Sequence, residues 1–236
     1  MEMSLDTKMG LGVLSSKREI VIEDPLYTQL LGQYRAASQA DDRAGMDKAA
    51  SRLTKEWFKG SIKPGQARRL DSARQVNCGE FPGAGNLSAV VRWTPGPKYL
   101  QVAVDVVDAS FSTDCPKGQP WEASCVEILV SPCGAADTIN QFFVIPRGDG
   151  GVPVVEGAHT DRESEIIAAY KRTATGYKAG VKIPYSILRG YRPGWKVLPV
   201  EAMVNSRTPR GRSQLIMTAP AEPWQDARGY AGLRAR

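Results

Sequence analysis

The sequence predicts a mainly β protein, an antiparallel β-sandwich that follows an N-terminal helical extension. From about residue 68 onward, segments of alternating apolar and polar residues recur, with turn residues roughly every 8–12 positions. Glycine (23) and proline (16) are plentiful, which suits a fold with many turns. Ahead of that point, apolar residues instead recur at helical spacing. We therefore expect a helical hairpin over residues 1–62 and a sandwich over residues 63–236.

The first helix is expected to begin at Asp24 and Pro25, because Asp24 can cap it and Pro25 suits a first helical turn. A second helix is expected from about Asp41 and ends at Gly60. Apolar residues recur at helical spacing in both helices: at steps of four in the first (Leu26, Leu30 and Tyr34), and at steps of four, three and four in the second (Met46, Ala50, Leu53 and Trp57). We expect these stripes to pack on each other and on the sandwich, the alternative being that they dock to another module or partner.

The expected strands alternate in character and end at turn residues. They cover residues 87–93, 99–107, 125–130, 141–145, 165–171, 177–183, 195–205, 213–217 and 230–233, with one helical turn over residues 184–188. In the strand at 125–130, Val126, Ile128 and Val130 are expected on one face, and the residues between them on the other. The β region spans about 170 residues, enough to bury a substantial core without metals or disulfides.

Composition and charge narrow the function classes. No apolar run approaches the ~18 residues of a membrane-spanning helix, and the N-terminus lacks the pattern of a signal peptide. The formal net charge is +6. The densest basic cluster, Arg207, Arg210 and Arg212, lies in an expected hairpin without interleaved aromatic residues. This pattern favours an exposed, solubilising turn over a nucleic-acid partner.

Four cysteines, Cys78, Cys115, Cys125 and Cys133, permit three full pairings. One or two disulfides and buried free thiols are both consistent with the sequence. The single histidine, His159, and the lack of a Cys-x-x-Cys pair argue against structural zinc.

The segment 120–132 combines an aromatic residue with a strongly β-prone run. Trp121 lies at the mouth of a loop, with Glu122 beside it and Glu127 on the strand that follows. An indole can cover the C–H face of a sugar ring while fixed carboxylates accept hydrogen bonds from hydroxyls. The alternative is a rim or core tryptophan and a solvated strand glutamate.

The order of segments resembles that of the family 9 carbohydrate-binding modules and their wider relatives, which share a sandwich superfamily with the DOMON domains. The segments that carry the resemblance are residues 99–108, 120–132, 141–144, 177–188 and 228–233. The resemblance covers about residues 75–234, and its most specific parts together are Trp-Glu-x-x-x-Val-Glu and Ile-Pro-Tyr-Ser-x-Leu.

This resemblance implies a jelly-roll or DOMON-like sandwich that binds mono-, di- or oligosaccharides without catalysing a reaction. It further implies an extracellular or periplasmic location and a neighbouring enzyme domain of a glycan-degrading system. Trp121 matches one wall of the family's sugar clamp, and Glu127 matches the acid that receives sugar hydroxyls. Two departures stand out: the family's arginine on the next strand would fall near Phe143, and only Trp224 remains to supply the second clamp ring.

The resemblance also implies calcium, which often steadies this fold. Oxygen ligands would come from Asp105, Asp108, Asp114 and Glu122, although their spacing forms no recognised loop and ordinary surface carboxylates are the alternative.

Three functions remain. In a non-catalytic sugar-binding module, Trp121 and Trp224 would stack on the sugar while Glu122, Glu127, Gln141 and Asn205 line the site. A haem-binding relative would draw on His159, Met203 or Met217. A structural or interaction module would use the helical hairpin. An enzyme has the least support, because Glu122 and Glu127 lie together at the start of a strand without a catalytic signature.

Overall fold

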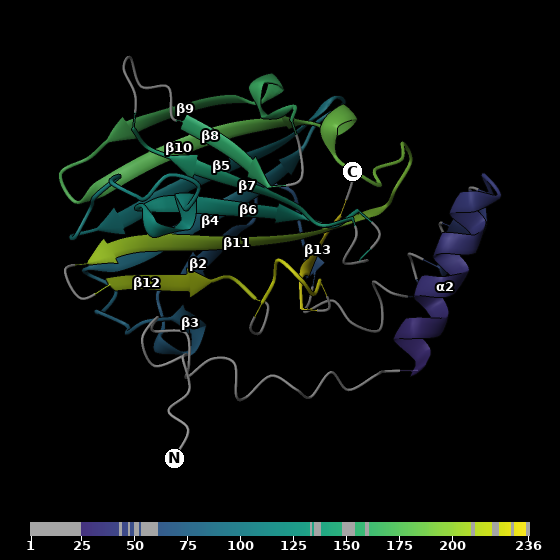
Figure 1. The fold of residues 1–236 in the computed structure, drawn as a ribbon, viewed down its shortest axis with the longest axis horizontal. Coiled ribbons are helices and arrows are strands. Elements are labelled where there is room, and N and C mark those ends of the chain that lie inside the picture. Colours follow the sequence, from purple (N-terminus) through teal and green to yellow (C-terminus); the bar gives the residue numbers. More distant parts are fainter. Residues whose placement is uncertain are drawn as a thin grey trace.

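The fold is known from a computed structural model. It describes residues 25–42, 44–46, 48–49, 52, 61–132, 134, 138–147, 154–158, 161–208, 211–218, 222–227 and 229–234. Two β-sheets stack face to face, and helix α2 (Pro25–Gln39) lies beside them (Figure 1). The predicted fold class, a mainly β sandwich with an N-terminal helical extension, is confirmed.

The larger sheet has eight strands and the smaller sheet has five. The eight-stranded sheet runs in the order β1-β13-β11-β6-β7-β8, with β12 paired to β11 and to β3. Its strands are β1 (Ser61–Ile62), β3 (Val76–Cys78), β6 (Cys125–Val130), β7 (Asn140–Ile145), β8 (Val154–Ala158), β11 (Val197–Thr208), β12 (Gly211–Ile216) and β13 (Ala231–Arg234). The five-stranded sheet consists of β2 (Ala67–Leu70), β4 (Leu87–Pro95), β5 (Tyr99–Asp108), β10 (Gly176–Pro184) and β9 (Ile167–Arg172), in that spatial order.

All the strands expected from alternation are present, with bounds shifted by a few residues. Strands β1, β2, β3 and β8 were not expected. The first three have only two to four residues each, too few to show a period. Strand β1 pairs parallel with β13, so the otherwise antiparallel sandwich already includes Ser61 and Ile62. The division at residues 62 and 63 stays a prediction.

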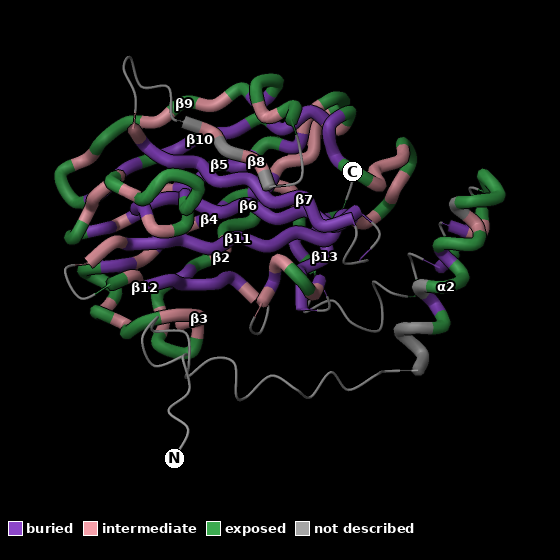
Figure 2. Tube along the Cα trace, viewed as in Figure 1, coloured by how far each residue is buried: buried purple, intermediate pink, exposed green. Residues whose placement is uncertain are grey.

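The hydrophobic core lies between the two sheets. On β6, the side chains of Val126, Ile128 and Val130 join it, as the alternation predicts. On β5, Val102, Val104 and Val106 join it from the facing sheet. Strands β6 and β7, however, are buried at every position, whereas β9 has no buried residue (Figure 2). The outward face of the eight-stranded sheet is therefore covered, while that of the five-stranded sheet meets solvent.

The helical extension packs as expected. After α2, described residues 44–46, 48–49 and 52 are again helical. Tyr34, Met46 and Ala49 form a buried cluster against Trp195 of the sandwich. The rings of Tyr34 and Trp195 meet edge to face with centroids 6.3 Å apart. For these residues, packing on each other and on the sandwich is confirmed; Ala50, Leu53 and Trp57 lie outside the described residues. Within the described part of the chain, no helix is long and apolar enough to cross a membrane.

Candidate functional site

Glu127 lies at the centre of the covered face of the eight-stranded sheet. Alternation along β6 turns Val126 and Ile128 toward the core and Glu127 away from it. Its Cα partners are Met203 on β11 and Phe143 on β7. Even so, Glu127 is only 2% exposed. The interpretation of Glu127 as a solvated strand residue is wrong, because loops and neighbouring strands cover this face.

Three side-chain amides from three strands hold the carboxylate of Glu127. Oε1 accepts a hydrogen bond from Asn205 Nδ2 at 2.6 Å and another from Gln214 Nε2 at 2.8 Å. Oε2 accepts one from Gln141 Nε2 at 2.7 Å. Gln214 also donates to Asn205 Oδ1 at 2.8 Å and accepts from Asn77 Nδ2 at 2.5 Å. We refer to Glu127, Gln141, Asn205, Gln214 and Asn77 as the amide network.

The amide network opposes the electrostatic cost of burying a carboxylate. Burial raises the pKa of Glu127 above its ordinary value, while the three amides and the charge of Arg212 act in the opposite direction. An ionised carboxylate offers about four acceptor positions. Donors among the described residues fill three, which leaves one on Oε2. Gln141, at 8% exposed the least buried of these three donors, keeps a second N–H on its amide nitrogen.

Trp121 stands at the rim of the amide network. It lies in the 3₁₀ turn η3 (Pro120–Glu122) and is 36% exposed. Its ring centroid is 6.1 Å from that of Phe143, whose backbone pairs with Glu127. An apolar cluster of Ala123, Cys125, Phe143 and Ile145 supports this side of the site. The exposed indole therefore packs against Phe143, the residue that is paired with Glu127 on the neighbouring strand.

Two arginines of the β11–β12 hairpin hold the turn that carries Trp121. Arg212 Nη1 donates to the carbonyl of Trp121 and Arg207 Nη1 to that of Glu122, each at 3.4 Å. Both arginines are half-buried, so their interpretation as an exposed, solubilising turn is wrong. Arg210 lies outside the described residues. Within the described part of the chain, the buried Nε of Arg212 has no hydrogen-bond partner. The positive charge that acts on Glu127 therefore comes from Arg212 on β12, and not from a residue near Phe143 on β7.

Trp224 lies on the other side of the amide network. It is half-buried and packs against a cluster that includes Leu129, Met203 and Tyr230. This cluster follows Glu127 along β6, whereas the Trp121 side precedes it. Glu201 anchors residues 217 and 218, which follow β12 and lead toward Trp224. Its carboxylate accepts hydrogen bonds from the backbone N–H groups of Ala202, Met217 and Thr218 and from the Thr218 hydroxyl.

The predicted site residues are thus brought together to different degrees. Glu127, Gln141 and Asn205 form one hydrogen-bonded cluster, Trp121 lies at its rim against Phe143, and Trp224 packs on the adjoining apolar cluster. Glu122 is beside Trp121, but it contributes only its backbone carbonyl to the contacts described above. Three participants were missed: Gln214, Arg212 and Asn77. For Gln214 a signal existed, because the hairpin at residues 207–212 sets the register that places it opposite Asn205.

The metal and haem expectations find no support in the described residues. No three histidine, cysteine, aspartate or glutamate side chains among them gather to hold a metal ion. Asp105, Asp108, Asp114 and Glu122 therefore do not fit a calcium site: Asp105 pairs with Arg92 and Lys178, and buried Asp108 accepts from Ser206. Met203 and Met217 are buried in the core, and His159 lies outside the described residues.

Three of the four cysteines are described, and all three are free thiols: Cys78, Cys115 and Cys125. Burial raises the pKa of the Cys125 thiol well above its ordinary value, and Glu127 adds to the shift. Asn205 Nδ2 donates to this sulfur at 3.2 Å, so Cys125 supports the amide network. Cys133 lies outside the described residues.

Comparison with known proteins identifies the fold. No protein-family model matches the sequence, and no curated protein matches it. Solved structures do match. A family 9 carbohydrate-binding module from Caldicellulosiruptor kristjanssonii in complex with cellotriose is 13% identical with a TM-score of 0.53, over 75% of this chain and 92% of that one. The same kind of module from that organism with glucose gives 12% and 0.56, over 76% and 94%.

A third similar structure is a protein from Bacteroides uniformis named as a candidate carbohydrate-binding protein. It is 15% identical with a TM-score of 0.52, over 75% of this chain and 98% of that one. At these identities the likeness concerns the fold. This chain has the fold of the family 9 carbohydrate-binding modules.

Proposed function

We propose that this chain is a non-catalytic carbohydrate-binding module in which Trp121 and the amide network share one sugar ring. The observation that carries this proposal is an exposed indole packed on Phe143, the strand neighbour of a buried carboxylate that three amides hold in place. A surface tryptophan alone has many explanations. A polar network beside it, buried on a covered sheet face, calls for a functional explanation.

The chemistry of the cluster suits a sugar. The indole of Trp121 offers a flat apolar face for the C–H groups of the ring. A hydroxyl can donate to the remaining acceptor position on Glu127 Oε2 and accept from the second N–H of Gln141. Arg212 Nε offers a further donor. A ligand that leaves such groups unpaired loses about 1–3 kcal/mol for each, which makes the network a source of selectivity.

The similar solved structures suggest the class of sugar. Those from Caldicellulosiruptor kristjanssonii hold cellotriose and glucose. We extend this to the present chain and propose glucose or a β-1,4-linked glucose oligomer as ligand, with Trp224 as a second contact and Glu122 at the rim. An extracellular or periplasmic location, and attachment to a glycan-degrading enzyme, belong to the same proposal.

A catalytic role receives no support from this cluster. Glycoside hydrolysis requires two carboxyl groups about 5–10 Å apart on either side of the bond. The amide network contains one carboxylate, Glu127. Glu201 lies on the same sheet face, but both of its oxygens accept hydrogen bonds from the chain that it anchors. We therefore propose that the site binds and does not react.

Calorimetric titration of the full chain with glucose, cellobiose and cellotriose tests the proposal. We expect binding to at least one of them, and we expect Trp121→Ala to weaken it about tenfold or more by removing the stacking surface. Ile167→Ala is the matched control, because Ile167 is also a large exposed apolar residue, 57% exposed, on the other sheet. Absence of heat with all three sugars at millimolar concentrations would sink the proposal.

A further inference from the structure

An aromatic groove lies at another part of the sandwich. It has a volume of about 940 Å³ and lies between the β4–β5 turn at residues 95–97 and the segment that leads from β10 into β11. Its described lining comprises Pro95, Gly96, Pro97, Tyr185, Tyr191, Gly194, Trp195, Lys196, Val197 and Arg234. Sites for small ligands commonly have volumes of about 300–1,000 Å³. The groove is therefore large enough for a ligand of two or three rings.

Three half-buried aromatic residues form one wall of this groove. The rings of Tyr185 and Tyr191 are stacked, with centroids 4.4 Å apart and planes 6° from parallel. Trp195 lies next to Tyr191 at 6.2 Å and 44°. Both tyrosines line the groove and are half-buried, so part of each ring is accessible to a ligand.

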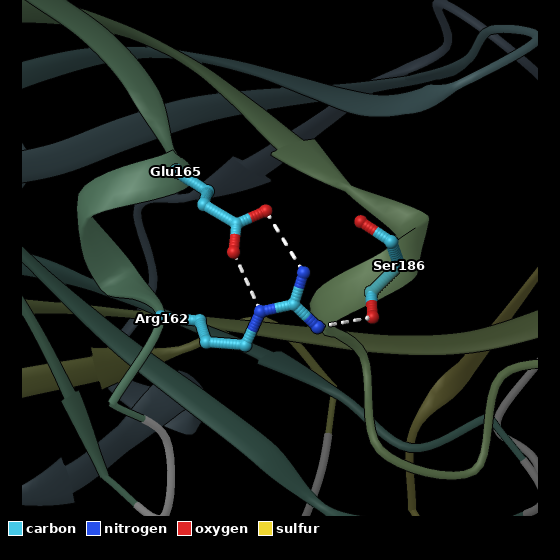
Figure 3. Close-up of polar contacts among 3 residues, drawn as sticks. All are labelled: Arg162, Glu165 and Ser186. Atoms are coloured by element: carbon cyan, nitrogen blue, oxygen red, sulfur yellow. Dashed lines mark hydrogen bonds and ion pairs between the residues drawn. The ribbon is translucent and has the colours of Figure 1, made fainter.

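Contacts with Arg162 and with helix α2 fix the aromatic wall. Arg162 Nη1 donates to the carbonyl of Ser186 at 3.0 Å, and Ser186 lies in the 3₁₀ turn η7 (Tyr185–Ile187) that carries the first tyrosine (Figure 3). The guanidinium of Arg162 is in turn gripped by both oxygens of Glu165. Trp195 packs edge to face against Tyr34 of α2. A wall fixed in this way loses little conformational entropy when a ligand binds.

The charges around the groove have one sign. Lys196 and Arg234 are exposed, and none of the lining residues that the structure describes is acidic. Neither cation forms an ion pair with a described residue, although Arg234 Nε donates to Ser61 Oγ at 2.8 Å. The tyrosines add no negative charge at neutral pH, because burial raises the pKa of Tyr185 to about 12 and also raises that of Tyr191.

We propose that this groove is a second saccharide site, specific for an acidic sugar such as a hexuronate unit of an oligosaccharide. The C–H face of the sugar lies on the tyrosine pair, and its carboxylate lies between Lys196 and Arg234. The guanidinium suits a carboxylate because it can donate two parallel hydrogen bonds. A neutral sugar of the same shape forms no ion pair with either cation and binds more weakly.

This site is independent of the proposed Trp121 site. Val197 of the groove pairs with Arg234 at the start of β11, whereas Asn205 pairs with Cys125 near its end. At about 3.3 Å per residue, the eight steps from 197 to 205 separate the two by roughly 26 Å along the strand. Failure at one site therefore leaves the other untouched, and variants of each serve as controls for the other.

Titration of the full chain with trigalacturonate tests the proposal, with maltotriose as the neutral trisaccharide of the same α-1,4 linkage. We expect trigalacturonate to bind, and its affinity to fall as sodium chloride rises from 50 to 300 mM, because exposed charges are screened. Tyr191→Ala and Lys196→Gln should each weaken it about tenfold, while Trp121→Ala leaves it unchanged. Lys196 is exposed, so Lys196→Gln keeps the test valid if Tyr191→Ala does not fold.

Four results would overturn this inference. Trigalacturonate gives no heat at millimolar concentration; maltotriose binds Trp121→Ala as tightly as trigalacturonate does; Trp121→Ala, and not Tyr191→Ala, removes the uronate signal; or decaproline binds in a Tyr191-dependent manner while trigalacturonate does not. The last result would assign the groove to an extended proline-rich peptide, a class that also docks on aromatic grooves.

Discussion

The two sheets each carry a carboxylate on the outward face of a central strand, and the two carboxylates differ in exposure and in partners. On the five-stranded sheet, the side chain of Asp105 is 41% exposed and pairs with Arg92 and Lys178, each at 3.2 Å. On the eight-stranded sheet, Glu127 is 2% exposed and is held by neutral amides. Water can replace the partners of Asp105 but not those of Glu127. The difference places a fixed polar network on the covered sheet and solvent-exposed ion pairs on the other.

The largest contrast is expected in stability. Glu127→Ala leaves the amides of Gln141, Asn205 and Gln214 without their shared acceptor, so we expect the free energy of unfolding to fall by about 3 kcal/mol or more. Urea denaturation of the variant and the wild type measures this fall. A cost no larger than that of Asp105→Ala would contradict the role of the amide network as a buried, satisfied unit.

Glu127→Gln is expected to remove sugar binding while largely preserving shape. An amide replaces the charged acceptor, so affinity should drop about tenfold or more. Calorimetric titration of this variant with the sugar that the wild type binds tests the drop. Retention of full affinity in Glu127→Gln would show that the charge of Glu127 plays no part in binding.

The same residue predicts a pH dependence. The pKa of Glu127 is raised in the folded protein, so folding favours the protonated carboxyl group. This contribution to the free energy of unfolding is complete below the ordinary pKa of 4.5 and is lost as pH rises through the raised pKa. The free energy of unfolding of the wild type should therefore fall relative to Glu127→Gln across that window, while sugar affinity rises as the carboxylate ionises. Denaturation and titration series from pH 4 upward measure both slopes. Parallel stability curves for the two proteins would contradict the raised pKa.

A smaller effect is expected for Arg212→Met. Loss of the positive charge should raise the pKa of Glu127 further, and loss of the hydrogen bond to the Trp121 carbonyl should weaken sugar binding a few-fold, about the value of one such bond. Carbon NMR of the Glu127 carboxyl group gives the pKa. Arg92→Met, which removes a cation from the exposed sheet, is the control and should move neither quantity.

The smallest effect is expected for Asp105→Asn. Exposed ion pairs contribute about 0–1 kcal/mol and weaken as salt screens them. Urea denaturation at low and high ionic strength should show a change in unfolding free energy within that range, and less of it in high salt. A cost as large as that of Glu127→Ala would remove the distinction between the sheets.

The sequence predicts the periodic parts of this molecule well. The faces of β6 follow from the alternation of Val126, Ile128 and Val130, and α2 begins where Pro25 indicates. Trp121 and Glu127 were found together because one short segment carries both. These features depend on neighbours in the chain, which a sequence displays directly.

The burial of the candidate site could not be predicted in this way. Glu127 is covered by segments without a period, such as the described residues 217–218, 222–227 and 229–230, which follow β12; Thr218 of this segment is anchored at Glu201. Asn77 joins the network from a strand of three residues, too short for any pattern. The role of Arg212 depends on the position of the η3 turn, which is distant in sequence and was not foreseen.

The most direct test of the central claim is a nitrogen–proton NMR titration with cellobiose. We expect the indole N–H of Trp121 and the side-chain amides of Gln141, Asn205 and Gln214 to shift together and saturate, while the backbone amide of Ile167 stays in place. Saturable shifts elsewhere on the sandwich with these four groups unmoved, or no shifts at millimolar sugar, would contradict it.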